Sequence, residues 1–340
     1  MTHPHLAAIA TRPRPVGSEA NAQARQYCAD HLRSLGFEVA ERPFEFSALP
    51  GRYGAQIIGA GAVLGYGTSL LFDLPGIGGL TVILLMALTV WLGSAHATKG
   101  RFFREVGTNL EATRGSDSPR VWLVAHIDTK SQPISSALRS IAVVALIVPL
   151  LLGFYFRSIP VRSLGIGGGV LLMLAAVRSK SDGAADNGSG VAAVLEAASM
   201  VSHDRSIGVL ITDAEELALA GATAWATGRE PGIALNCDTV DDGGRLVIFE
   251  YGYFSRAVDE HAGAVARSVD PKTRVTRPPP GVLTDSNAFH RAGWQSVTLA
   301  RGTFRTLNRI HTRRDSLDSM RGTGIPDAAR VLARLAEELA

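Results

Sequence analysis

Long uncharged stretches interrupt an otherwise polar chain. Residues 54 to 72 and 77 to 95 carry no charged side chain, and a turn at residues 73 to 76 joins them. A helix that crosses a bilayer needs roughly 20 apolar residues. The pattern therefore predicts a membrane-spanning helical hairpin over residues 54–96, while the glycines of the first stretch leave a buried helix pair in a soluble core as the alternative.

A second pair of apolar stretches follows at residues 140 to 156 and 163 to 177, joined by a turn at residues 157 to 162. Both are shorter than a comfortable membrane span, and the glycines at residues 165 to 169 lower the helix propensity of the second. We predict a second transmembrane hairpin over residues 134–177, which tilts, re-enters or thins the bilayer to fit.

The remaining segments, residues 1–53, 97–133 and 178–340, alternate between helix-like and strand-like patterns. Such alternation predicts an α/β domain with a mixed, mostly parallel sheet sandwiched by helices, and its chemistry at the carboxyl ends of the strands. The expected strands are 37–41, 104–112, 121–125, 207–212, 233–236, 245–249 and 296–300. Residues 14–36 are expected to form a loop and then a helix that Gly36 ends, and the other expected helices are 191–198, 216–227, 254–268 and 326–339.

Charge and cysteine content narrow the function classes. The net charge is +3, and no Lys/Arg-rich run is interleaved with aromatic residues, so nucleic acid is not an expected partner. Cys28 and Cys237 are far apart in the sequence and fit a reducing compartment. The first residues lack the pattern of a secretory signal peptide.

Basic residues near the apolar stretches predict the orientation in the membrane. They are concentrated on the side of the polar domain, which is therefore expected to face the cytoplasm. The domain side has Arg42, Arg52, Lys99, Arg101, Arg104, Lys130, Arg139, Arg178 and Lys180, and the far turns have only Arg157 and Arg162.

Acidic and histidine side chains follow the predicted strands. Taken singly, each has an ordinary structural explanation, such as a helix cap, a turn or a solvated loop. Gathered at one sheet edge, these carboxylates would repel one another unless cations compensated them. Two histidines and three carboxylates, one of them free to bridge, match the ligands of two Zn²⁺ ions, and a further carboxylate could serve as a base. The acidic and histidine residues considered for this site are His126, Asp128, Asp186, Glu215, Glu216, Asp238 and His311.

The ordered motifs resemble those of the co-catalytic zinc exopeptidases of metallopeptidase family 28, the aminopeptidase Y type. The motifs are His126-x-Asp128, Gly183-x-x-Asp186-Asn187-x-Ser189-Gly190, Asp213-x-Glu215-Glu216, Asn236-x-Asp238 and His311-Thr312. The opening Arg14-Pro15-Val16-Gly17-Ser18-Glu19 and the later Asp285-Ser286-Asn287-x-Phe289 are also similar to that family.

The resemblance implies a role for each position. Asp186 would bridge two zinc ions, His126 with Glu216 or Asp238 would take terminal ligand places, and His311 would complete the second site. Glu215 would be the general base. Asp128 would orient His126.

The resemblance implies a membrane-embedded zinc aminopeptidase that acts on peptide or aminoacyl-amide substrates. If the second hairpin holds the active-site mouth at the bilayer surface, apolar or lipid-associated substrates are favoured. Amide deacylation, glutaminyl cyclisation and carboxypeptidase action remain alternatives. A catalytically dead, receptor-like protein is disfavoured because no ligand position is lost.

Two features depart from the family pattern. Ile310 stands where many relatives have a tyrosine that stabilises the oxyanion, which leaves the oxyanion donor open. A long insertion also separates Asp128 from Asp186, which the family normally joins by a short loop.

Overall fold

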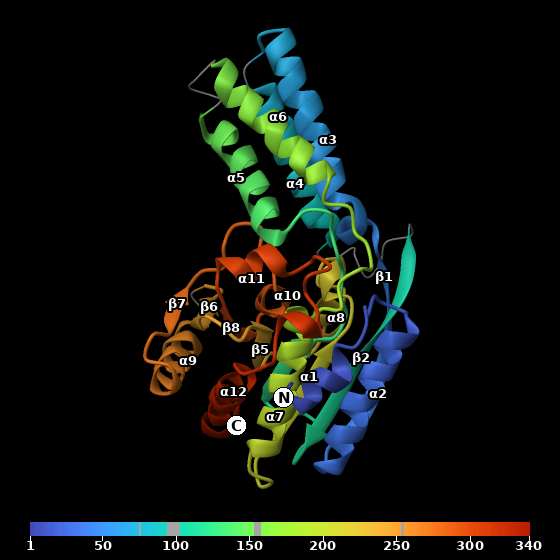
Figure 1. Ribbon diagram of the computed structural model, residues 1–340, viewed down its shortest axis with the longest axis vertical. Coiled ribbons are helices and arrows are strands. Elements are labelled where there is room, and N and C mark those ends of the chain that lie inside the picture. Colours follow the sequence, from blue (N-terminus) through green and yellow to red (C-terminus); the bar gives the residue numbers. More distant parts are fainter. Residues whose placement is uncertain (75, 94–102, 153–157, 253–254) are drawn as a thin grey trace.

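The computed structural model describes residues 1–74, 76–93, 103–152, 158–252 and 255–340. These residues form a domain of helices and strands, which contains both chain ends, and a stalk of helices that projects from it (Figure 1). Lys99, Arg101 and Arg157 lie outside the described residues, as do Ala95, Phe156 and Phe254, which end or begin predicted ranges.

One mixed sheet of eight strands, in the order β1-β2-β4-β3-β5-β8-β6-β7, forms the centre of the domain. Strands β4, β3, β5 and β8 run parallel, whereas β1, β2 and β6 join by antiparallel pairing. The predicted mixed sheet flanked by helices is confirmed. The strands are β1 (Glu38–Ser47), β2 (Arg104–Arg114), β3 (Val121–His126), β4 (Ile207–Thr212), β5 (Ile233–Val240), β6 (Arg245–Glu250), β7 (Arg274–Thr276) and β8 (Gln295–Gly302).

Alternate side chains of the central strands supply two hydrophobic cores. In β3, Leu123 and Ala125 belong to the core beneath α7 and α12, whereas Trp122 and Val124 belong to the core beneath α8 and α10. This period-2 pattern buries both faces of the sheet. The domain helices are α1 (Pro4–Ile9), α2 (Glu19–Ser34), α7 (Ser189–Met200), α8 (Ala220–Ala226), α9 (Arg256–Val269), α10 (Asp285–Arg291), α11 (Phe304–Arg309) and α12 (Ile325–Leu339).

The helix expected over residues 216–227 is divided. A single 3₁₀ turn, η2 (Glu215–Leu217), comes first, and α8 begins only at Ala220. Ala218 and Leu219 between them have φ of 72° and 60°, in the left-handed region that a right-handed helix cannot contain. The break turns the acidic pair Glu215-Glu216 away from the axis of α8.

The stalk comprises two helical hairpins, α3 (Leu49–Leu71) with α4 (Ile77–Gly93), and α5 (Ser136–Leu152) with α6 (Ile159–Met173). α6 joins the hairpins by packing against both α3 and α5. The backbones of α3 and α6 approach closely, because a Cβ on Gly169 would lie 2.7 Å from the carbonyl oxygen of Gly59. Small residues at such a crossing permit packing without large apolar side chains.

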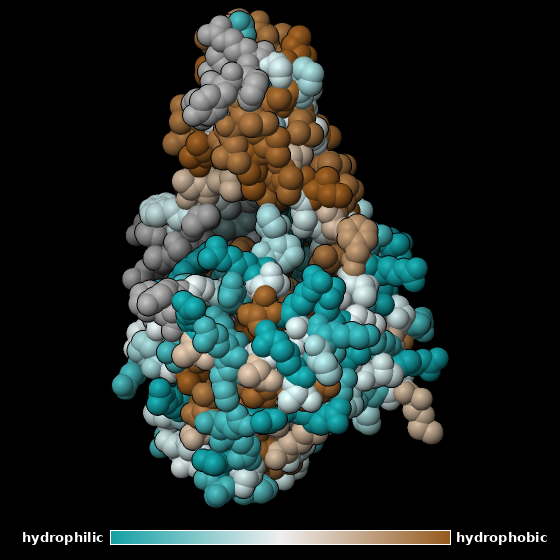
Figure 2. All heavy atoms as spheres, turned by 90° about the vertical axis from the view of Figure 1, so that its left-hand side faces the viewer, coloured by the Kyte–Doolittle hydropathy of each residue, from teal (hydrophilic) through white to brown (hydrophobic). Residues whose placement is uncertain are grey.

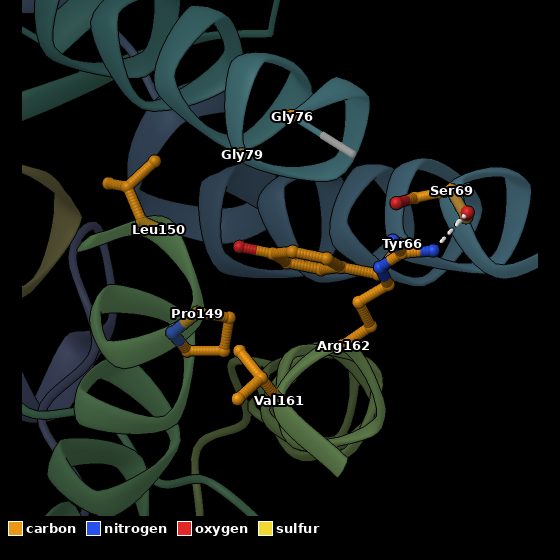
Figure 3. A pocket seen from close by; sticks show the side chains of 8 residues that line it. All are labelled: Tyr66, Ser69, Gly76, Gly79, Pro149, Leu150, Val161 and Arg162. Atoms are coloured by element: carbon orange, nitrogen blue, oxygen red, sulfur yellow. Dashed lines mark hydrogen bonds between the residues drawn. The ribbon is translucent and has the colours of Figure 1, made fainter. Parts of the chain in front are cut away.

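One cation lies inside the stalk. Arg162 at the start of α6 is 5% exposed, and its guanidinium donates to the carbonyl oxygen of Ser69 at 2.7 Å and pairs with Asp73 at 3.0 Å. Figure 3 shows this side chain beside the ring of Tyr66, between the helices of the two hairpins. The charge is therefore paired rather than left alone in an apolar interior.

Among the described helices, α3 alone is both long and apolar enough to cross a membrane. The apolar part of α4, Ile77–Thr89, and the helices α5 and α6 are shorter. α3 begins before the predicted residue 54 because Pro50 fits a first helical turn and Arg52 is held by Glu105 of β2, with N–O distances of 2.8 and 2.9 Å.

Candidate metal centre

The ends of three neighbouring strands deliver most of the site. His126 is the last residue of β3, η2 follows β4, and Asp238 lies near the end of β5. Since β3 pairs in parallel with both β4 and β5, their carboxyl ends meet at the same edge of the sheet. Asp186, in the turn before α7, and His311, after α11, complete the group.

Asp186 lies between the two histidines. Its Oδ1 is 3.3 Å from His126 Nε2, and its Oδ2 is 2.8 Å from His311 Nε2. One carboxylate thus faces two imidazoles through its two oxygens, which is the geometry that a bridging ligand requires. The sequence loop 183–190 predicted this carboxylate directly before a helix, and Asp186 lies in the turn that precedes α7.

The side chains form two groups of potential ligand atoms, each group with its atoms within 4.8 Å of one another. The first group is His126, Glu215 and Asp238, and the second is Asp186, Glu216 and His311. In the second group, Glu216 Oε1 is buried 3.1 Å from His311 Nε2 yet makes no hydrogen bond in the described part of the chain. Buried imidazole and carboxylate atoms that converge in this way suit Zn²⁺, which binds such N and O donors.

Burial and mutual proximity perturb these carboxyl groups. Burial raises the pKa of Glu215 well above its usual value; His126 opposes this rise, and Glu216 and Asp238 add to it. For Asp186, burial acts to raise the pKa, but His311 and His126 outweigh it and hold the pKa well below the usual value. The site therefore combines an anionic carboxylate between two imidazoles with a second carboxylate that readily holds a proton.

Asp128 lies beside both the acidic pair and the ring of His126. Its carboxylate accepts the backbone N–H groups of Glu215 at 3.0 Å and Glu216 at 3.1 Å. The Nδ1 atom of His126 lies 3.2 Å from the backbone carbonyl oxygen of Asp128 and 3.6 Å from its carboxylate. Asp128 therefore fixes the acidic pair through its carboxylate, and both its carbonyl and its carboxylate lie beside Nδ1 of His126.

Further polar groups hold the turn that carries Asp186. The Asp315 carboxylate accepts the backbone N–H groups of Ala185 at 2.7 Å and Asp186 at 3.0 Å. Arg14 is fully buried and donates to the carbonyl oxygens of Ile127 and Gly183 at 2.9 and 3.0 Å. Arg14, which begins the segment that is similar to a family motif, therefore links the end of β3 to the turn that carries Asp186.

Two neighbours of the site were not predicted as site residues. Lys130 Nζ lies 2.5 Å from Glu216 Oε2, and His311 together with Lys130 lowers the pKa of Glu216 to about 2 against the effect of burial. Ser136 Oγ lies 2.8 Å from His311 Nδ1. Ile310 is buried in the main core, so its side chain contributes no polar group to the site.

Solved aminopeptidases share this fold. The chain is similar to the aminopeptidase from Aneurinibacillus sp. strain AM-1, with a TM-score of 0.60, 14% identity, and coverage of 99% of this chain and 93% of that one. It is similar to BSAP, a zinc aminopeptidase from Bacillus subtilis, with a TM-score of 0.59, 13% identity and coverage of 99% and 94%.

The glutaminyl cyclase of Porphyromonas gingivalis is also similar, with a TM-score of 0.56, 14% identity and coverage of 96% of this chain and 93% of that one. Identities this low establish the likeness of the fold. A search of curated proteins found no match. The chain belongs to Peptidase family M28, whose sequence model matches residues 109–336.

Proposed function

We propose that this protein is a membrane-embedded, di-zinc exopeptidase that removes N-terminal residues from peptides. The observation that carries the proposal is the position of Asp186, whose two oxygens lie 3.3 and 2.8 Å from the Nε2 atoms of His126 and His311. Family membership supports peptide hydrolysis, and the zinc aminopeptidase of the same fold supports the choice of metal.

Each ligand-type residue has a role in this proposal. His126 and Asp238 would hold one ion, Glu216 and His311 would hold the other, and Asp186 would be shared between the two sites. Two zinc ions bound there supply polarisation of the scissile carbonyl and a lowered pKa for the attacking water. Glu215 takes the proton from that water and transfers it to the leaving amine, a task that suits a carboxylate whose pKa burial raises.

The stalk lies in the membrane and the domain faces the cytoplasm in this proposal. Support comes from the length and composition of α3, and from the basic residues Arg52, Arg139 and Arg178 near the domain ends of the stalk helices. The mouth of the site then lies close to the bilayer surface, where apolar or lipid-associated peptides are concentrated.

Metal analysis and a base substitution test the activity. The full chain, purified in detergent, should carry two zinc ions and hydrolyse aminoacyl reporter amides. Glu215→Gln should lower kcat by about 10²–10⁴-fold while zinc stays bound. Glu230→Gln, at an exposed glutamate, is the matched control and should leave kcat unchanged. Zinc-free protein, or full activity in Glu215→Gln, would contradict the proposal.

A glutaminyl cyclase is the second candidate, because one of the structurally similar proteins has that activity. A panel of peptides separates the two. An aminopeptidase cleaves substrates with a free α-amine and rejects N-acetylated copies, whereas a cyclase converts N-terminal glutamine and releases ammonia without cutting the chain.

Thiol labelling tests the orientation. Cys28 and Cys237 are fully buried, so a cysteine introduced at an exposed position gives the signal. In intact cells, a membrane-impermeant maleimide should label Leu74→Cys at the tip of the first hairpin and spare Ser116→Cys in the domain. The reverse pattern would place the domain outside the cell.

A further inference from the structure

The base of the second hairpin contacts a predicted metal ligand directly. Ser136 is the first residue of α5 and is 2% exposed, and its Oγ lies 2.8 Å from Nδ1 of His311. The backbone N–H of Gln132 donates to the carbonyl oxygen of His311 at 2.7 Å. The segment that enters the stalk thus holds both the ring and the backbone of His311.

The backbone of His311 needs such support. Its φ is +60°, in the left-handed region, where a residue with a Cβ is destabilised by about 1 kcal/mol or more. A strained conformation persists only when its surroundings fix it. The hydrogen bond from Gln132 is one such constraint, and the contact with Ser136 fixes the ring that projects from this backbone.

The two chain segments at the base of the hairpin are tied to each other. Ser131 and Arg178 exchange backbone hydrogen bonds of 2.6 and 2.7 Å, and the Gln132 side chain donates to the carbonyl oxygen of Ala175 at 3.1 Å. The exit from α6 therefore stabilises the same residues that hold His311. A displacement of the second hairpin would be transmitted to this histidine.

We infer that the second hairpin is part of the metal centre, with Ser136 as a positioning residue that makes metal binding at His311 depend on the packing of α5. If Nδ1–H of His311 donates to Ser136 Oγ, the lone pair of Nε2 faces Asp186 and Glu216, which is the tautomer a metal needs. This inference rests on the proposed di-zinc function.

Zinc titration tests the inference without relying on activity. Hydrogen-bond partners of a metal-ligating histidine affect metal affinity by 10–100-fold. Ser136→Ala should weaken binding of one zinc ion by about that factor and leave the other ion unchanged, whereas Ser136→Thr, which retains a hydroxyl, should bind both nearly as the wild type does. Ser140→Ala, one turn further along α5, is the matched control and should bind both ions normally.

Hydrogen exchange supplies an independent measurement, because coupling between two sites is reciprocal. Saturating the wild type with zinc, so that the site at His311 is filled, should slow amide exchange in the first turns of α5. Ser136→Ala should reduce this protection. If the wild type binds two ions and Ser136→Ala alters neither affinity nor protection, the inference is overturned and the proposed function stands. A wild type that binds no zinc overturns both.

Discussion

The domain and the stalk differ in how many large apolar side chains they expose. The domain buries Leu123, Leu195 and Phe289 completely. The stalk buries Gly59, Gly65 and Gly168 and places large apolar residues on its surface, with Leu64 71% and Leu71 82% exposed. Figure 2 shows the result as an apolar stalk above a largely polar domain.

This difference supports the proposed placement of the stalk in a membrane and of the domain in water. In water, burying large apolar side chains is the main driving force for folding. Between lipid tails that force is absent, and helices associate through close contact of small residues. The stalk follows the second rule, although its helices other than α3 are too short to pass a length criterion for spanning.

The largest effect is expected from a charge on the surface of the stalk. Leu84 of α4 is 60% exposed, and an arginine at the centre of a membrane helix costs about 2.5–3.5 kcal/mol. Leu84→Arg should therefore lower the free energy of unfolding in lipid bilayers by about that amount. Met200→Arg, at an exposed apolar residue of the domain, should change it by less than about 0.5 kcal/mol. Equal effects of the two substitutions would remove the distinction between the solvents.

An intermediate effect is expected from a methyl group between α3 and α6. A Cβ on Gly169 would meet the carbonyl oxygen of Gly59, whereas one on Gly167 has no atom within 4 Å. Gly169→Ala should destabilise the stalk by about 1–3 kcal/mol through overpacking. Gly167→Ala should be neutral or slightly stabilising, because alanine has the higher helix propensity. Unfolding in detergent measures both, and a stalk unaffected by Gly169→Ala would argue against close packing.

The smallest effect concerns a buried carboxyl in the domain. Burial, with Glu250 and Glu260 nearby, raises the pKa of Asp259 from 3.8 to about 7. A raised folded-state pKa means that the contribution to stability is present below pH 3.8 and is lost as the pH rises through 7. The free energy of unfolding of Asp259→Asn, relative to that of the wild type, should therefore rise between pH 4 and pH 8. We expect a rise of about 1 kcal/mol after allowance for solvent screening.

Thermal unfolding at a series of pH values measures that gain. Glu230→Gln, at an exposed glutamate that does not shift the pKa of Asp259, is the control, and its stability relative to the wild type should change little from pH 4 to pH 8. An advantage of Asp259→Asn that stays constant with pH would show that the carboxyl is ionised throughout.

The local pattern of apolar and polar residues was sufficient to predict individual strands. The apolar run from Ile207 to Thr212, bounded by polar residues, coincides with β4. His126, Glu216 and Asp238 could be predicted as neighbours because each follows or ends a parallel strand, and such ends meet at one sheet edge. The fold class was therefore within reach of the sequence, whereas the order of the strands in the sheet was not predicted.

Features that depend on distant partners were not predictable. Ser136 contacts His311 across 175 residues, and nothing near Ser136 marks it as different from Ser135. The break before α8 results from two left-handed residues, Ala218 and Leu219, whose types favour helix.

The order of strands along the chain determines when strand pairs can form during synthesis. β1 and β2 are adjacent in the sheet but are separated in the sequence by the first hairpin, and β3 and β4 are separated by the second. During synthesis, neither pair can form until the intervening hairpin has emerged. Synthesis of both hairpins therefore precedes closure of the sheet, and a chain arrested within either hairpin would leave a strand without its neighbour.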